Sequence, residues 1–198
     1  MGNRRLGRKR LYSVNKLGQT NGNAAGGGIV DAVVSNTVRR EGHKIITEIS
    51  VDLGTSKAAV VSVTTDLDII GVANGLNAAL TTLTPAVNGY ITYVEMACLE
   101  APTGGTEDID LYLADEVTTT ETSGYLITSA TETALITAGG DWTLGAVDHY
   151  AVTHGTLFDL GSESNGLYLT CGDANTAATY TAGKFIITLE GYAVPDDK

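Results

Sequence analysis

The segment KIITEISVDL, residues 44–53, decides the fold class, because its apolar and polar side chains alternate along the chain. One face carries apolar side chains and one threonine: Ile45, Thr47, Ile49, Val51 and Leu53. The other face carries Glu48, Ser50 and Asp52. A period of two is typical of a strand with one buried face, so this segment predicts a strand at the surface of a core.

Similar short runs, rich in β-branched or alternating residues, predict further strands at residues 58–63, 67–72, 90–99, 109–114, 150–153, 167–171 and 184–194. In the last run, Phe185, Ile187 and Leu189 share one face. The turn-forming stretch APTGGTED separates residues 90–99 from residues 109–114. We therefore expect these two strands to pair as a central hairpin.

Three stretches are less regular. Residues 29–38 suit either a helical turn or an extended strand, and residues 73–88 read as a long connection with room for one helical turn before Pro85. Residues 115–148 are expected to form extended loops or edge strands. Eight or so short strands without a long amphipathic helix predict an all-β fold, a single β-sandwich domain over residues 29–198 with a jelly-roll arrangement.

Charge divides the chain sharply. The formal net charge is −11, yet residues 1–44 hold nine basic and two acidic residues, a net charge of +7, which leaves −18 for the remainder. An acidic body repels nucleic acid and anionic membranes, so either contact would have to pass through the basic segment. No apolar run approaches the ~18 residues of a membrane span, and we expect a soluble protein made in a cytoplasm.

Residues 1–28 are predicted to be a flexible basic arm, because residues 1–16 show no strand or helix period and QTNGNAAGGG, residues 19–28, reads as a mobile linker. The candidate partner-binding residues are the five clustered cations of this arm: Arg4, Arg5, Arg8, Lys9 and Arg10. Guanidinium groups pair bidentately with carboxylates or phosphates, so a neighbouring acidic copy or nucleic acid would suit them. The alternative is a tail that only aids solubility.

Few residues suggest chemistry. Cys98 and Cys171 sit in apolar segments and are expected to be reduced core residues. His149 and His154 are five apart in an expected strand and so face opposite ways, which argues against a histidine metal site. An acidic cluster suits either a calcium loop or, as we expect, a solvated hairpin tip: Glu107, Asp108, Asp110, Asp115 and Glu116.

Motifs of catalysis are not found in the sequence. It contains no G-x-S-x-G and no Walker loop, and the glycines at residues 26–28 neither follow a strand nor begin a phosphate-binding helix. We therefore predict a protein that is not an enzyme, with no catalytic residue, cofactor or metal.

The opening MGNRRLGRKRLYSVNKLGQ, the glycine-rich linker and the threonine-rich β-body together resemble virion structural proteins of tailed bacteriophages. The likeness is greatest to capsid decoration or cement proteins with jelly-roll bodies, and the opening is similar to the start of such proteins from marine phages. This resemblance implies homo-oligomers, such as trimers, seated between capsomers in the virion. The implied partners are the major capsid protein and neighbouring copies.

Two other classes stay open. Small icosahedral virus coat proteins also join a basic arm to a jelly roll, where the arm binds packaged nucleic acid; five cations in the first ten positions are few for that role. A tail-associated carbohydrate-binding module would be expected to offer aromatic rings for sugar stacking. Aromatic residues make up only 6% of the chain, with Trp142 as its one tryptophan.

Overall fold

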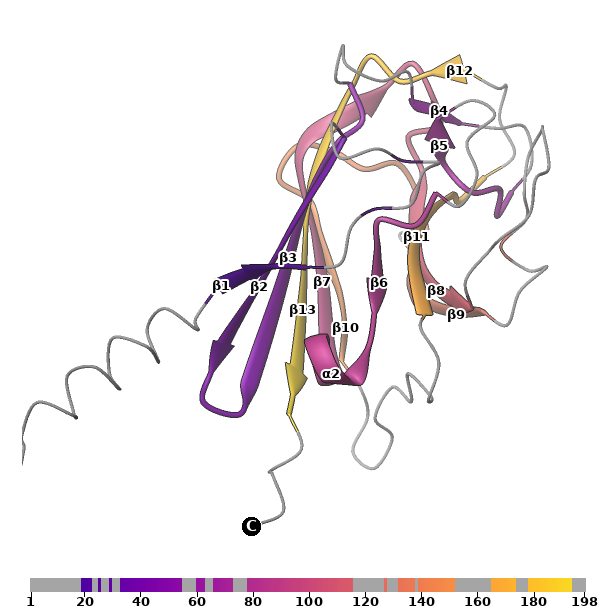
Figure 1. Cartoon of the computed structure of the whole chain (residues 1–198). Helices are drawn as coiled ribbons and strands as arrows, with labels where there is room; N and C mark the ends of the chain where they lie inside the picture. Colours follow the sequence, from indigo (N-terminus) through magenta and orange to yellow (C-terminus); the bar gives the residue numbers. More distant parts are fainter. Residues whose placement is uncertain are drawn as a thin grey trace, which may run out of the picture.

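The protein is almost entirely β-structure in a computed structural model that describes residues 19–22, 25, 29, 33–54, 60–62, 66–72, 78–115, 127, 132–137, 139–151, 165–173 and 178–193 (Figure 1). The strands are β1 Gln19–Asn21, β2 Val34–Glu41, β3 Lys44–Asp52, β4 Val60–Ser62, β5 Gly71–Val72, β6 Thr81–Leu83, β7 Tyr90–Thr103, β8 Ile109–Asp115, β9 Glu132–Ile136, β10 Val147–Ala151, β11 Asn165–Cys171, β12 Ala178–Thr179 and β13 Ala182–Tyr192. A single turn of helix, α2 Pro85–Asn88, precedes β7.

Two antiparallel sheets face each other across one core. The larger sheet has six strands in the order β1-β2-β3-β13-β7-β10, and the smaller has four in the order β6-β11-β8-β9. A third small sheet, β12-β4-β5, lies at one end of the molecule (Figure 1). The predicted all-β fold with two packed sheets is thus confirmed.

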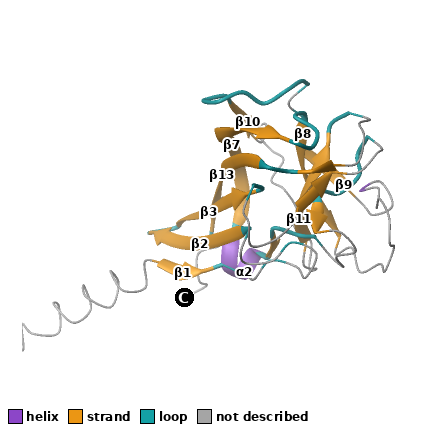
Figure 2. Cartoon of the chain, turned by 90° about the horizontal axis from the view of Figure 1, so that it is seen from above, coloured by secondary structure: helices purple, strands orange, loops and turns teal. Residues whose placement is uncertain are grey.

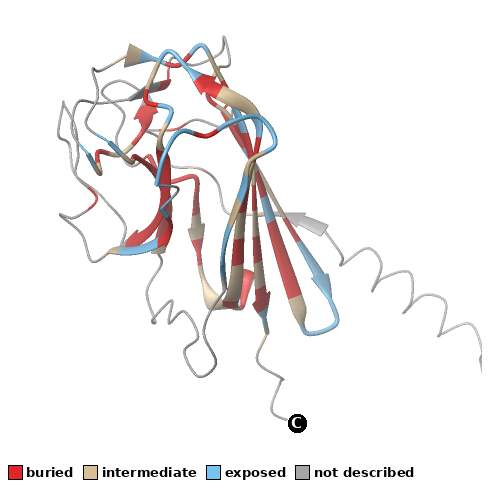
Figure 3. Cartoon of the chain, turned by 180° about the vertical axis from the view of Figure 1, so that it is seen from behind, coloured by how far each residue is buried: buried red, intermediate tan, exposed pale blue. Residues whose placement is uncertain are grey.

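The core forms because alternate residues of both sheets turn inward. The larger sheet contributes Ile49, Val51, Met96, Phe185, Ile187 and Leu189, and the smaller contributes Leu111, Leu113, Leu167 and Leu169. Red, buried segments recur along the strands of both sheets in Figure 3. The predicted shared face of β13 and the buried face of β3 are both confirmed.

The predicted central hairpin is wrong. β7 pairs with β13 and β10, whereas β8 pairs with β11 and β9, so the two strands belong to opposite sheets. β7 also continues past residue 99 to Thr103. The turn-forming residues 104–108 carry the chain across the sandwich, and Gly104, with φ of 92°, allows the backbone to pass close to the carbonyl oxygen of Thr179.

Other differences are local. The expected connection at residues 73–88 contains β6 and α2, and the helical turn begins at Pro85 instead of ending before it. Thr84 caps this turn, because its Oγ1 accepts a hydrogen bond of 3.3 Å from the Val87 backbone nitrogen. Residues 34–38 are strand, and the short strand β1 lies within the expected linker, paired with β2.

The outer face of the four-stranded sheet is covered by the chain itself. Tyr112 and Tyr168 form a second buried cluster there with Ala79, Ile127 and partly buried Leu67. The other cluster members are Ala114 and Ile69. In contrast, no described element covers the outer face of the six-stranded sheet (Figure 2). The two sheets therefore differ in what they present to a partner.

Candidate protein-interaction face

The five cations of the predicted arm, Arg4, Arg5, Arg8, Lys9 and Arg10, lie outside the described residues, as do Glu116 and His154. What the structure describes is the surface of the folded body. The outer side of the six-stranded sheet is called the open face below, and it is built from β2, β3, β13, β7 and β10.

Strand register brings apolar side chains together on the open face. Ile186 of β13 is the partner of Ala97 on β7, and Ala97 is in turn the partner of Val147 on β10. Leu99 lies where the β7–β13 register shifts, a bulge that leaves it without a partner in β13. Val147 and Leu99 are 57% and 55% exposed. We call Ala97, Leu99, Val147 and Ile186 the apolar row.

A shallow groove of about 380 Å³ runs beside this row. Side chains from four strands contribute to its lining: Ser35, Ser50, Asp52, Leu99, Lys184 and Ile186. Ser35 pairs with Ser50, and Ser50 pairs with Ile186, so small hydroxyl side chains continue the apolar row toward the sheet edge.

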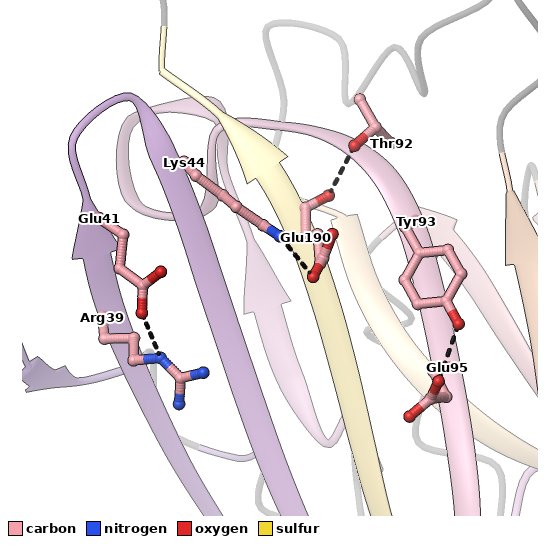
Figure 4. A network of polar contacts seen from close by, with 7 residues as sticks. All are labelled: Arg39, Glu41, Lys44, Thr92, Tyr93, Glu95 and Glu190. Carbon is pink, nitrogen blue, oxygen red and sulfur yellow. Dashed lines mark hydrogen bonds and ion pairs between the residues drawn. The ribbon is translucent and has the colours of Figure 1, made fainter.

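Charged side chains fill the other end of the open face (Figure 4). Lys44 Nζ donates to Glu190 Oε1 at 2.7 Å, and this hydrogen bond raises the pKa of Lys44. Arg39 lies 3.3 Å from Glu41 and 4.0 Å from Glu48. Each basic group here is therefore already matched by a carboxylate of the same sheet.

Tyr93 and Glu95 form a polar pair next to this network (Figure 4). The Tyr93 hydroxyl donates to Glu95 Oε2 at 2.8 Å, and that bond is the main cause of the raised pKa of Tyr93. The ring of His149, on the neighbouring β10, lies 5.8 Å from the Tyr93 ring, centroid to centroid. The Tyr93 hydrogen bond holds the Glu95 side chain on the open face, on the strand next to the edge strand β10.

Carboxylates outnumber cations on the open face. Lys184 Nζ donates to Glu100 Oε2 at 2.5 Å, which lowers the pKa of Glu100. The carboxylates are Glu41, Glu48, Asp52, Glu95, Glu100 and Glu190, and the cations are Arg39, Lys44 and Lys184. Among the described residues, Asp52 and Glu95 form no ion pair within 4.0 Å. The surface thus keeps an excess of negative charge.

The predicted acidic cluster is not a solvated hairpin tip. Asp110 is only 6% exposed, on the covered side of the four-stranded sheet, whereas Glu107 is exposed. Burial, followed by the charge of Asp173, raises the pKa of Asp108. Within the described ranges, no three His, Cys, Asp or Glu side chains are placed to hold a metal ion.

Both cysteines and the one tryptophan of the chain are buried in the core. Cys98 and Cys171 are buried in the core and form no disulfide, as expected. Trp142 is 4% exposed, donates from Nε1 to the Ile109 carbonyl at 2.7 Å and meets Phe185 edge-on. Of the helices that the structure describes, none has the length and hydrophobicity to cross a membrane.

The sequence predicts part of the open face, because the alternation in β3 places Glu48, Ser50 and Asp52 on its outward side. The apolar row was missed, because its members come from three strands that are distant along the chain. Models of known protein families and curated protein sequences both give no match to this chain. Function is therefore inferred from the strand order, the open face and the division of charge.

Proposed function

We propose that this protein is a non-enzymatic virion structural protein, a capsid decoration or cement protein that stabilises a phage head. In this role the β-body contacts the major capsid protein and neighbouring copies, and the basic N-terminal arm extends the contact. The order of the strands in the two facing sheets carries the jelly-roll part of the proposal, and the division of charge between the N-terminal segment and the body carries the assembly role.

The strand order supports a jelly-roll body. Eight strands of the facing sheets are, in chain order, β3, β6, β7, β8, β9, β10, β11 and β13. Numbered from one to eight, they form the sheets 1-8-3-6 and 2-7-4-5. This is the order produced when a long antiparallel hairpin is wrapped into two sheets, as in the double Greek key of a jelly roll. β1 and β2 extend the larger sheet at its β3 side.

Jelly rolls occur in capsids, in lectins and in cupins, so the fold alone does not choose among these roles. The interior between the sheets is packed with aliphatic side chains and Phe185, which favours a structural body over a ligand-binding barrel. Trp142 packs in that core and is not an exposed platform for a sugar ring. Both observations favour the virion role over a carbohydrate-binding module.

Division of charge favours protein partners. The segment with the five clustered cations precedes a body whose open face has an excess of carboxylates. Complementary patches steer association and fix its orientation, so copies of this chain suit each other in a homo-oligomer, for which a trimer is the expected state.

The coat-protein alternative is tested with nucleic acid. We expect weak binding without sequence preference, because the body's negative charge opposes the arm's positive charge. Gel shifts with the purified protein at near-physiological salt measure this affinity. Tight binding that persists at high salt would favour a coat protein whose arm binds the genome.

The location of the protein tests the virion role itself. Mass spectrometry of purified phage particles should detect the chain in many copies, and cryo-electron microscopy should place it on the outer surface between capsomers. Density on the inner surface against the genome would favour the coat-protein alternative. Absence from purified particles would refute both virion roles.

A further inference from the structure

We propose that the open face of one copy binds the N-terminal segment, residues 4–14, of a second copy. This inference rests on the proposed assembly role and deepens it, because it names the surface on which the arm docks. The acceptor site combines the apolar row with the two open-face carboxylates that form no ion pair among the described residues, Asp52 and Glu95.

The open face is the side of the body on which exposed apolar side chains gather on adjacent strands. The chain covers the outer face of the four-stranded sheet with its own residues, such as Ala79 and Ile127, but leaves the apolar row exposed at two positions and partly exposed at the other two. Val147 and Leu99 are both more than half exposed and lie on adjacent strands. Exposed apolar side chains gathered with a groove and a polar rim are typical of an interaction site.

Charge decides what kind of partner fits. Residues after position 44 carry a net charge of −18, so two bodies that met face to face would repel each other. The N-terminal segment has the opposite charge and also contains apolar side chains that suit the row: Leu6, Leu11, Tyr12 and Val14. Its cations can pair with Asp52 and Glu95, which stand at the two sides of the apolar row.

The direction of β1 favours a second copy over the same chain. Gln19 pairs with Arg39 and Asn21 pairs with Thr37, so the chain runs along β1 toward Ser35 and the groove. The chain therefore enters β1 at Gln19 from the side of the β2–β3 turn, and the position of Gln19 is about 13 Å from Ser35 along β2. Up to ~60 Å of extended chain lies in the first 18 residues, enough to reach a neighbour placed beyond that turn.

Such a contact is heterologous, because the donor segment and the acceptor face are different surfaces. Each copy donates one segment and accepts one, so the contacts close into a ring when the rotation between copies allows it. A closed trimer would use every donor and every acceptor.

A complementation experiment with the full chain separates donor from acceptor. The donor-deficient variant replaces Arg4, Arg5, Arg8, Lys9 and Arg10 with Ser; the acceptor-deficient variant carries Asp52→Lys and Glu95→Lys. Asp66→Lys with Glu107→Lys is the matched control, because it reverses two exposed charges next to Leu67 and β8, on the side of the four-stranded sheet. Circular dichroism and thermal unfolding establish that all variants are folded.

Analytical ultracentrifugation at low salt measures the association. The wild type and the control should self-associate, each deficient variant should associate roughly tenfold to hundredfold more weakly, and their mixture should form a one-to-one complex. Monomeric wild type, an acceptor-deficient variant that associates like the wild type, or a mixture that stays monomeric would each overturn the inference. Presence in phage particles is measured separately, so failure here leaves the proposed virion role standing.

Discussion

At the scale of single residues, the Oδ1 atom of Asp108 is buried, although a solvated hairpin tip was expected there. Asp108 lies just before β8 and packs against Gly172, which has no side chain. A Cβ atom added to Gly172 would lie 2.5 Å from Asp108 Oδ1, so only glycine leaves room for this carboxylate. That oxygen is buried and has no hydrogen-bond partner among the described atoms. Burial is the main cause of the raised pKa of Asp108. The negative charges of Asp173, Asp141 and Asp66 raise this pKa further.

Replacing Asp108 with Asn should stabilise the protein at neutral pH. The folded-state pKa of Asp108 is raised, so its ionised form disfavours folding above that pKa, and the penalty disappears as the pH falls through it. The new amide oxygen can still accept the hydrogen bond from the Gly140 backbone. Thermal unfolding should give a higher midpoint for Asp108→Asn at pH 7 and equal midpoints near pH 3. Glu107→Gln, at an exposed neighbour, serves as the control and should change little.

Phe185 and Leu99 are both large and apolar but differ in exposure, at 1% and 55%. Phe185→Ala should lower the free energy of unfolding by about 3–5 kcal/mol, because it leaves a cavity beside Trp142. Leu99→Ala should change it by about 0.5 kcal/mol or less, yet weaken self-association. Urea unfolding gives the free energies and ultracentrifugation the association. A large loss of stability in Leu99→Ala would mean that the residue supports the fold and is not a docking contact.

At the scale of strands, alternation along the sequence identifies β3 and the inward face of β13, because burial of one face imposes a period of two. Pairing is not local. The stretch APTGGTED has the composition of a hairpin turn, but the same residues suit a connection that crosses from one sheet to the other. Asp110 was expected at the surface and is buried because residues distant in sequence cover that face. The apolar row was hidden for the same reason.

Truncation tests how far the body depends on its first residues. Removal of residues 1–28 should leave an all-β circular dichroism spectrum, because only the three-residue strand β1 is lost from the described sheet. A truncation of residues 1–18 retains β1 and is the matched control. The longer truncation should unfold at a lower temperature, since it frees the edge of β2. A helical or unfolded spectrum for it would show that the N-terminal residues belong to the domain.

At the scale of the whole molecule, residues 1–44 are basic and the rest of the chain is acidic. This division of charge affects both the solubility of single copies and their association. The negative charge of the body favours the solubility of separate copies, and in the proposed assembly the basic residues near the N-terminus supply the attraction between copies. An assembly held in this way should respond to ionic strength, because exposed charges more than ~8 Å apart are largely screened at physiological salt.

Occupancy on phage particles therefore gives the final prediction. Replacing Arg4, Arg5, Arg8, Lys9 and Arg10 with Ser should leave the domain folded but lower its occupancy at low salt, and the difference from the wild type should shrink as salt rises. Each exposed pair contributes about 0.2–1 kcal/mol, so five together supply at most a few kcal/mol. Arg-to-Lys replacement at the four arginines keeps the charge and should retain most of the occupancy, less the bidentate component. Equal occupancy of the Ser variant and the wild type at low salt would show that the arm only aids solubility and that the β-body carries the contact.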